Sequence, residues 1–170
     1  GYGWALEHGY AFCGRVDADG QHPALELARL LALVRSDQCD VAVGSRFVSG
    51  DGFSPYRRRP SSSRRLGTAV LRRGMGLVLR RPFGDATSGL YAVNAKALPL
   101  LAEEFTTEAP EVEALIRIVD ASLRLEEVPV DMSPRAVGES KLRGGKAVKI
   151  VLTVAGALVA AKLLQSRRSR

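Results

Sequence analysis

The chain has 170 residues, of which 46% are hydrophobic and 25% are charged, as in an ordinary globular protein. This length supports one hydrophobic core and leaves no room for two domains of comfortable size. Only Cys13 and Cys39 occur, 26 positions apart and without a C-x-x-C pair, so neither a disulfide framework nor a zinc site is indicated. We therefore expect one domain in a reducing, cytoplasmic setting.

The net charge of +7 is unevenly distributed. Residues 52–84 carry nine Arg and no acid, residues 140–170 carry eight Lys or Arg and no acid, and the remainder has a net charge of −10. Two blocks of one sign on an acidic body favour an anionic partner, such as a phospholipid surface, a lipid phosphate or a nucleic acid. The alternative is that each block is only a solvated face.

The chain opens with a helical pattern over residues 1–9 and no signal peptide, so we expect the natural N-terminus to lie further upstream. Short apolar runs then predict four buried strands, at residues 10–16, 41–43, 90–93 and 123–130. Helical patterns lie between them at residues 24–34 and 111–121, each with a proline at its start. This alternation predicts an α/β fold with a largely parallel sheet.

Three segments fall outside this alternation. Residues 54–65 (SPYRRRPSSSRR) predict a loop, and a basic helix is expected over about residues 66–79. Residues 150–161 are twelve uncharged residues between Lys149 and Lys162, fewer than the roughly 20 that span a bilayer core. We expect a catalytic domain over residues 1–145 and an interfacial membrane helix with a basic tail over 146–170; a helix packed on protein is the alternative.

The strongest chemical motif ends the first predicted strand. Asp17 and Asp19 are separated by one residue, so both carboxylates can reach one divalent ion, and Gln21 can add an amide oxygen. Mg²⁺ and Mn²⁺ prefer such oxygen ligands and share them with substrate phosphates. A plain turn rich in Asp and Gly is the structural alternative.

Three further elements carry polar residues to the ends of predicted strands. Arg46 follows the second strand, at the sheet edge where α/β proteins bind ligands, and its guanidinium could grip a diphosphate or form a surface ion pair. Small polar residues precede the third strand and are candidate donor- or phosphate-binding residues, namely Asp85, Ser88 and Gly89. After the last strand, a flexible cationic segment could close on phosphate oxygens; it contains Arg135, Gly138, Ser140 and Lys141.

Taken in order, these motifs resemble the family-two glycosyltransferases related to dolichol-phosphate mannose synthase and its bacterial polyprenyl-phosphate counterparts. The resemblance covers about residues 1–150. Its motifs are V-D-A-D-G-Q-H-P, D-V-A-V-G-S-R-F, D-A-T-S-G-L-Y-A and E-V-P-V-D-M-S-P-R-A-V-G-E-S-K. Residues 1–9 are similar to the helix that follows the family's third strand, which implies that an N-terminal part of the domain is missing.

The resemblance implies a GT-A fold, a nucleoside-diphosphate sugar donor, Mg²⁺ or Mn²⁺, and inversion at the anomeric carbon. Asp17, Asp19 and Gln21 would bind the metal, and Arg46 would face the donor or acceptor phosphates. The loop that closes over the donor diphosphate would contain Arg135, Ser140 and Lys141.

Two acceptor classes follow from charge. A lipid phosphate is already anionic and needs no general base, whereas a sugar hydroxyl needs a carboxylate to take its proton. Glu111 and Glu113 occupy the region of the base in hydroxyl-acceptor relatives, although acids are favoured in a first helical turn in any case. We expect a polyprenyl-phosphate glycosyltransferase at the cytoplasmic membrane face. The alternatives are transfer to a saccharide hydroxyl and a basic membrane- or nucleic-acid-binding module; no aromatic stacking series or nucleic-acid motif favours the last.

Overall fold

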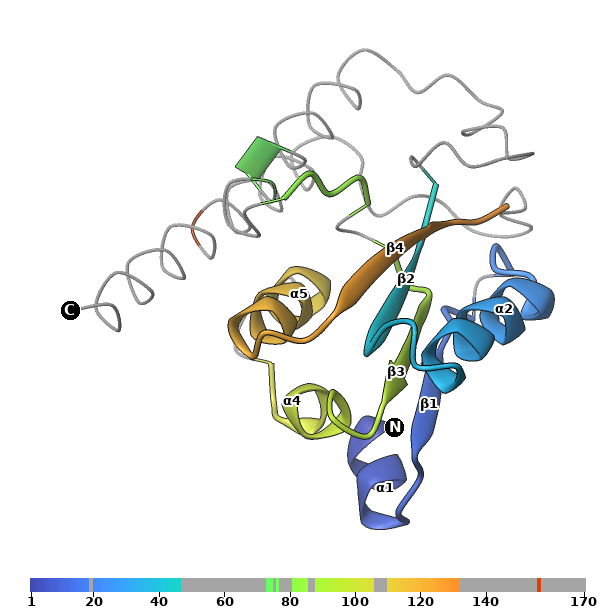
Figure 1. The fold of residues 1–170 in the computed structure, drawn as a ribbon, viewed down its shortest axis with the longest axis vertical. Helices are drawn as coiled ribbons and strands as arrows, with labels where there is room; N and C mark the ends of the chain where they lie inside the picture. Colours follow the sequence, from blue (N-terminus) through green and yellow to red (C-terminus); the bar gives the residue numbers. More distant parts are fainter. Residues whose placement is uncertain are drawn as a thin grey trace.

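The computed structural model has an α/β fold, in which the described residues form four strands and four bounded helices (Figure 1). The structure describes residues 1–18, 20–46, 73–74, 76, 81–85, 88–105, 110–131 and 156. Among the bounded elements the strands are β1 (Phe12–Arg15), β2 (Val41–Ser45), β3 (Tyr91–Asn94) and β4 (Leu125–Pro129). The bounded helices are α1 (Tyr2–Glu7), α2 (Ala24–Arg35), α4 (Leu98–Ala102) and α5 (Pro110–Asp120), and residues 73, 74 and 76 are also helical.

The strands form one sheet in the order β1-β3-β2-β4. β2 and β4 pair in parallel, whereas β3 pairs antiparallel with both β1 and β2. Three strands therefore share one direction and β3 runs against them. The predicted α/β class is confirmed, and the sheet, expected to be largely parallel, is mixed because β3 is inserted between two strands of the opposite direction.

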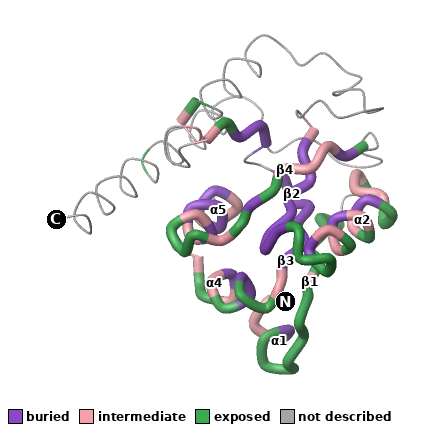
Figure 2. The backbone as a smooth tube through the Cα atoms, in the orientation of Figure 1, coloured by how far each residue is buried: buried purple, intermediate pink, exposed green. Residues whose placement is uncertain are grey.

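Helices cover both faces of the sheet (Figure 1). Strand side chains alternate between faces, so Val41, Val43 and Val93 pack with α4 and α5, while Ala42 and Ala92 pack with α2. Among the described residues, the centre of the sheet is the most buried part, and the outermost strand β1 is much more exposed (Figure 2).

The helix bounds follow from local sequence. α2 and α5 start at or directly after Pro23 and Pro110, whose fixed φ suits a first helical turn, and both lie within two residues of their predicted bounds. α4 is not among the predicted helices. Its five residues give no repeating apolar face, although Pro99 in its first turn marks a helix start.

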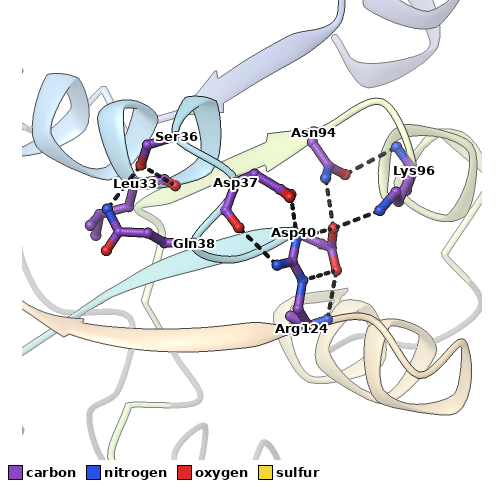
Figure 3. Close-up of polar contacts among 8 residues, drawn as sticks. All are labelled: Leu33, Ser36, Asp37, Gln38, Asp40, Asn94, Lys96 and Arg124. Atoms are coloured by element: carbon purple, nitrogen blue, oxygen red, sulfur yellow. Dashed lines mark hydrogen bonds and ion pairs between the residues drawn. The ribbon is translucent and has the colours of Figure 1, made fainter.

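At the edge of the sheet where β2 begins, a buried carboxylate joins three strands (Figure 3). Asp40 accepts hydrogen bonds from the backbone and guanidinium of Arg124, from the Asn94 amide and from Lys96. Arg124 also pairs with Asp37. These contacts hold the pKa of Asp40 well below its usual range, chiefly because of the Arg124 hydrogen bond, although burial acts in the opposite direction.

Three predicted segments lie outside the described residues: the loop at 54–65, most of the basic helix at 66–79 and most of the apolar run at 150–161. Within the described part of the chain, no helix is both long and apolar enough to cross a bilayer. The division into residues 1–145 and 146–170 remains a prediction.

Candidate active site

Four chain segments meet at the edge of the sheet opposite Asp40. β1, β2 and β4 end there, and the antiparallel β3 begins there. The direction of β3 therefore brings Ser88 and Gly89 to the same edge as Asp17 and Arg46. Gly44 N donates to the Leu90 carbonyl at 2.9 Å, and Val130 N donates to the Ser45 carbonyl at 3.0 Å, which extends the pairing to this edge.

Asp17 lies directly against Gly89. A Cβ placed on Gly89 would be 2.0 Å from Asp17 Oδ2 and 2.5 Å from Oδ1, so only glycine leaves room for the carboxylate in this position. The Asp17 side chain keeps 46% of its surface exposed. The structure thus joins two of the predicted motifs in one place and leaves the carboxylate open to a ligand.

Arg15 connects Asp17 to α5. Its Nη2 lies 2.9 Å from Glu111 Oε1 and 3.6 Å from Asp17 Oδ1. Arg15 is the last residue of β1 and Asp17 follows it two positions later, so the Arg15 side chain links the end of this strand to α5. Glu111 stands in the first turn of that helix.

Arg46 and Asp85 form a bidentate ion pair. Arg46 Nε donates to Asp85 Oδ2 at 2.6 Å, and Nη2 donates to Oδ1 at 2.7 Å; the Arg46 backbone N–H also donates to Oδ2 at 3.2 Å. The Asp85 side chain is fully buried and the Arg46 side chain is 18% exposed. The structure thus places Arg46 in an ion pair with Asp85, and the contact of Arg46 with phosphate groups stays a prediction.

A second carboxylate fixes the segment that carries Asp85. Glu127 of β4 accepts hydrogen bonds from the backbone N–H groups of Gly84 and Asp85 at 2.7–2.9 Å. A side chain at Gly84 would collide with Glu127, because a Cβ there would lie 2.8 Å from Oε1. Ser88 Oγ accepts the Leu90 N–H at 3.2 Å, so this serine shapes the entry into β3.

The two candidate bases are both held by arginines. Glu111 pairs with Arg15, as described above. Glu113 Oε1 accepts from Arg117 Nη2 at 2.7 Å, and Arg117 also donates to the carbonyls of Leu100 in α4 and Glu104 after it. Glu113 is therefore tied to the α4 side of α5, whereas Glu111 is tied to Asp17 through Arg15.

Two tyrosines lie on the side of the site that faces the hydrophobic core. Tyr91 stands opposite Arg15 in the β1–β3 register, is 2% exposed, and its hydroxyl has no hydrogen-bond partner among the described residues. Burial raises the pKa of Tyr91 well above its usual value, and the Glu111 charge acts in the same direction. Burial also raises the pKa of Tyr2 in α1. Both hydroxyls consequently remain protonated and neutral beside the Arg15–Glu111 pair.

The residues present fit a divalent ion in part. Asp17 supplies a hard carboxylate oxygen in a space that the missing Cβ of Gly89 keeps open. Across the described ranges, no group of three or more His, Cys, Asp or Glu side chains is arranged to hold a metal. Gln21 is described and partly buried, whereas the other predicted ligand, Asp19, lies outside the described residues. The predicted closing loop lies outside them too, with Arg135, Ser140 and Lys141.

Sequence reasoning missed three residues of the site: Arg15, Glu127 and Tyr91. The alternation of β1 could have found Arg15, because residues i and i+2 of a strand share a face and Asp17 had been identified. Tyr91 and Glu127 gave no such signal, since their roles depend on which strands are neighbours.

Comparison with known proteins reveals homologues. The chain is 34% identical over 160 residues to an undecaprenyl-phosphate mannosyltransferase from Micrococcus luteus. The matched region covers 91% of this chain and 62% of the relative. It is 29% identical over 160 residues to a polyprenol monophosphomannose synthase from Mycolicibacterium smegmatis, covering 91% of this chain and 58% of the relative. A dolichol-phosphate mannosyltransferase from Pyrococcus furiosus is 29% identical over 132 residues, covering 76% and 35% respectively.

These relatives confirm the resemblance that the four motifs predicted, and the sheet with its flanking helices is compatible with the fold of that family. The chain spans about three fifths of the length of the first two relatives and about a third of the third. No protein-family model matches the chain.

Proposed function

We propose that this chain, a homologue of the family-two glycosyltransferases, belongs to an enzyme that moves a sugar from a nucleoside diphosphate to a polyprenyl phosphate, with inversion. The observation that carries the proposal is the seating of the Asp17 carboxylate on Gly89, at the sheet edge where Arg46 and Asp85 are paired. The names of the three relatives, all transferases that attach mannose to a polyprenyl or dolichol phosphate, agree with it.

Asp17 would hold Mg²⁺ or Mn²⁺, together with Asp19 and Gln21. Such an ion, when bound, supplies Lewis-acid stabilisation for the charge on a departing diphosphate. The role of Asp17 is to present an exposed oxygen in a fixed place, which Gly89 makes possible. Arg135, Ser140 and Lys141 would bind the same diphosphate, as the resemblance implies.

The Arg46–Asp85 pair gives one wall of the site a fixed structure. Two hydrogen bonds from a planar guanidinium to a buried carboxylate fix both side chains, and Glu127 fixes the backbone on the Asp85 side. A preorganised wall is what a diphosphate site needs, because charged substrate groups are then bound without rearrangement. The Arg46 side chain keeps 18% of its surface exposed.

The engagement of both candidate bases favours a phosphate acceptor. A sugar hydroxyl would need a carboxylate directed at its proton, but Glu111 is held by Arg15 and Glu113 by Arg117. A lipid phosphate brings its own negative charge and attacks without a base. Because such an acceptor is anchored in a bilayer, we place the enzyme at the inner face of the cell membrane, with the two basic blocks against anionic headgroups.

A transfer assay with the full-length protein tests the acceptor. Radiolabelled nucleoside-diphosphate sugars are offered with Mn²⁺ and a polyprenyl phosphate, with the same polyprenol lacking phosphate, or with saccharide acceptors. We expect label in a lipid-linked product only when the phosphate is present. Transfer to saccharide hydroxyls without any lipid phosphate would instead support the sibling function.

A further inference from the structure

Arg15 is shared unequally between two carboxylates. The same nitrogen, Nη2, lies 2.9 Å from Glu111 and 3.6 Å from Asp17, so the hydrogen bond is made to Glu111 and only a longer electrostatic contact reaches Asp17. Glu111 is the less exposed of the two carboxylates, at 27% against 46%. The cation therefore belongs mainly to α5 and leaves Asp17 accessible.

The surroundings strengthen this arrangement. Tyr91 is fully packed in the core opposite Arg15, and Tyr2 packs against the same core cluster. Low-polarity neighbours on one side reduce screening of the charges, so the position of the guanidinium has a larger electrostatic effect than it would in open water. Both tyrosines remain neutral and therefore add no competing charge.

We propose that Glu111 is a positioning residue that holds Arg15 away from Asp17 and thereby keeps Asp17 available as a cation ligand. This inference rests on the proposed role of Asp17. It gives Glu111 a function other than that of a general base, because Glu111 acts on the site through Arg15.

The geometry gives the proposal a clear consequence. If Glu111 loses its charge, the nearest carboxylate left to Arg15 among the described residues is Asp17, 3.6 Å away. A guanidinium paired with Asp17 competes with a divalent cation for the same oxygens. If Arg15 is then removed as well, the competitor is gone and Asp17 is available again.

The test measures binding of Mn²⁺ alone to the full-length protein, by electron paramagnetic resonance of the free ion. The variants are Glu111→Gln, Glu111→Asp, the double variant Arg15→Met with Glu111→Gln, and Asp17→Asn. Glu26→Gln is the matched control, because it removes the charge of another Glu–Arg pair, on α2 at the other face of the sheet. Circular dichroism checks that each variant is folded.

We expect Glu111→Gln to weaken Mn²⁺ binding roughly 2- to 5-fold, the range for the energy of a partly exposed ion pair. Glu111→Asp, which keeps the charge, and Glu26→Gln should bind as the natural protein does. The double variant should regain at least the natural affinity, a recovery that a merely structural role of Glu111 does not produce.

Two results would overturn the inference: unchanged binding in Glu111→Gln, or a double variant that binds as weakly as the single one. Asp17→Asn separates this failure from that of the proposed function. If Asp17→Asn binds Mn²⁺ as well as the natural protein does, the assumed role of Asp17 is wrong. If it loses binding while Glu111→Gln does not, only the inference about Glu111 fails.

Discussion

The carboxylate of Asp17 occupies the space that a side chain at position 89 would fill. The built Cβ of Gly89 would lie 2.0 Å from Asp17 Oδ2, far closer than atoms of two side chains approach in proteins. The residues are distant in sequence, and they meet because β3 runs against β1 and begins where β1 ends. The glycine is therefore required for space, since its backbone φ is not in the left-handed region.

Replacing Gly89 by Ala should displace Asp17 and lower activity. The methyl group would force the flexible carboxylate to rotate away, so the fold should persist while transfer falls by at least about tenfold, the effect of a misplaced ligand group. Steady-state transfer assays measure this loss. Gly3→Ala is the control, because nothing lies within 4 Å of its added Cβ. Equal activity of the two variants would show that the Asp17 position is not needed.

The Arg46–Asp85 pair should contribute to stability. Asp85→Ala leaves a guanidinium without its carboxylate beside a buried site, so we expect a loss of about 3 kcal/mol in the free energy of unfolding. Urea unfolding of Arg46→Ala, Asp85→Ala and the double variant gives the coupling. A coupling energy of at least about 1 kcal/mol is expected for residues in direct contact. Additive effects of the two substitutions would contradict a stabilising interaction between the two side chains.

Asp40 should make stability fall in acid. Its folded-state pKa lies below the unfolded value near 3.8, chiefly because Arg124 donates hydrogen bonds to it. A depressed pKa adds stability that is present above the unfolded pKa and is lost as the pH falls towards the folded one. We therefore expect Asp40→Asn to cost about 1.5–3 kcal/mol at pH 7, as for hydrogen bonds to a charged group, and less as the pH falls from about 5 to 3.

Urea unfolding at several pH values measures this difference, with Asp131→Asn as a control because Asp131 is exposed. A gap between the natural protein and Asp40→Asn that stays constant from pH 7 to pH 3 would refute the assignment.

The two basic blocks should bind anionic membranes. Each Lys or Arg near such a surface contributes roughly 1 kcal/mol, which salt screens over a Debye length of about 8 Å. Co-sedimentation with vesicles should require anionic lipid and should weaken as ionic strength rises. Binding that is equal for neutral and anionic vesicles would rule out the electrostatic part.

Local patterns in the sequence predicted most of the fold. The four strands, α2 and α5 lie where apolar periodicity and helix-start prolines indicated, because these signals depend only on nearby residues. Strand order and the reversed direction of β3 could not be read in this way, since they are set by packing between distant segments. Five-residue α4 was missed because so short a helix has no periodic face.

The same limit applies to the site. The motifs identified Asp17, Arg46, Asp85 and Gly89, and the resemblance assigned these motifs to the family-two glycosyltransferases. The Arg46–Asp85 pair and the contact between Asp17 and Gly89 could not be predicted in this way, because both depend on which strands meet at one edge of the sheet. Arg15 and Glu111 are 96 positions apart, and no local pattern connects them.

The most direct measurement of the central claim is lipid-linked sugar formation by the full-length protein and by its Asp17→Asn variant. Both are given radiolabelled nucleoside-diphosphate sugar, a polyprenyl phosphate and Mn²⁺, and thermal unfolding verifies that both are folded. We predict a labelled glycosyl polyprenyl phosphate from the natural protein, its loss in chelator, and no more than a trace of product from Asp17→Asn. Undiminished turnover by Asp17→Asn, or in chelator, would contradict the account.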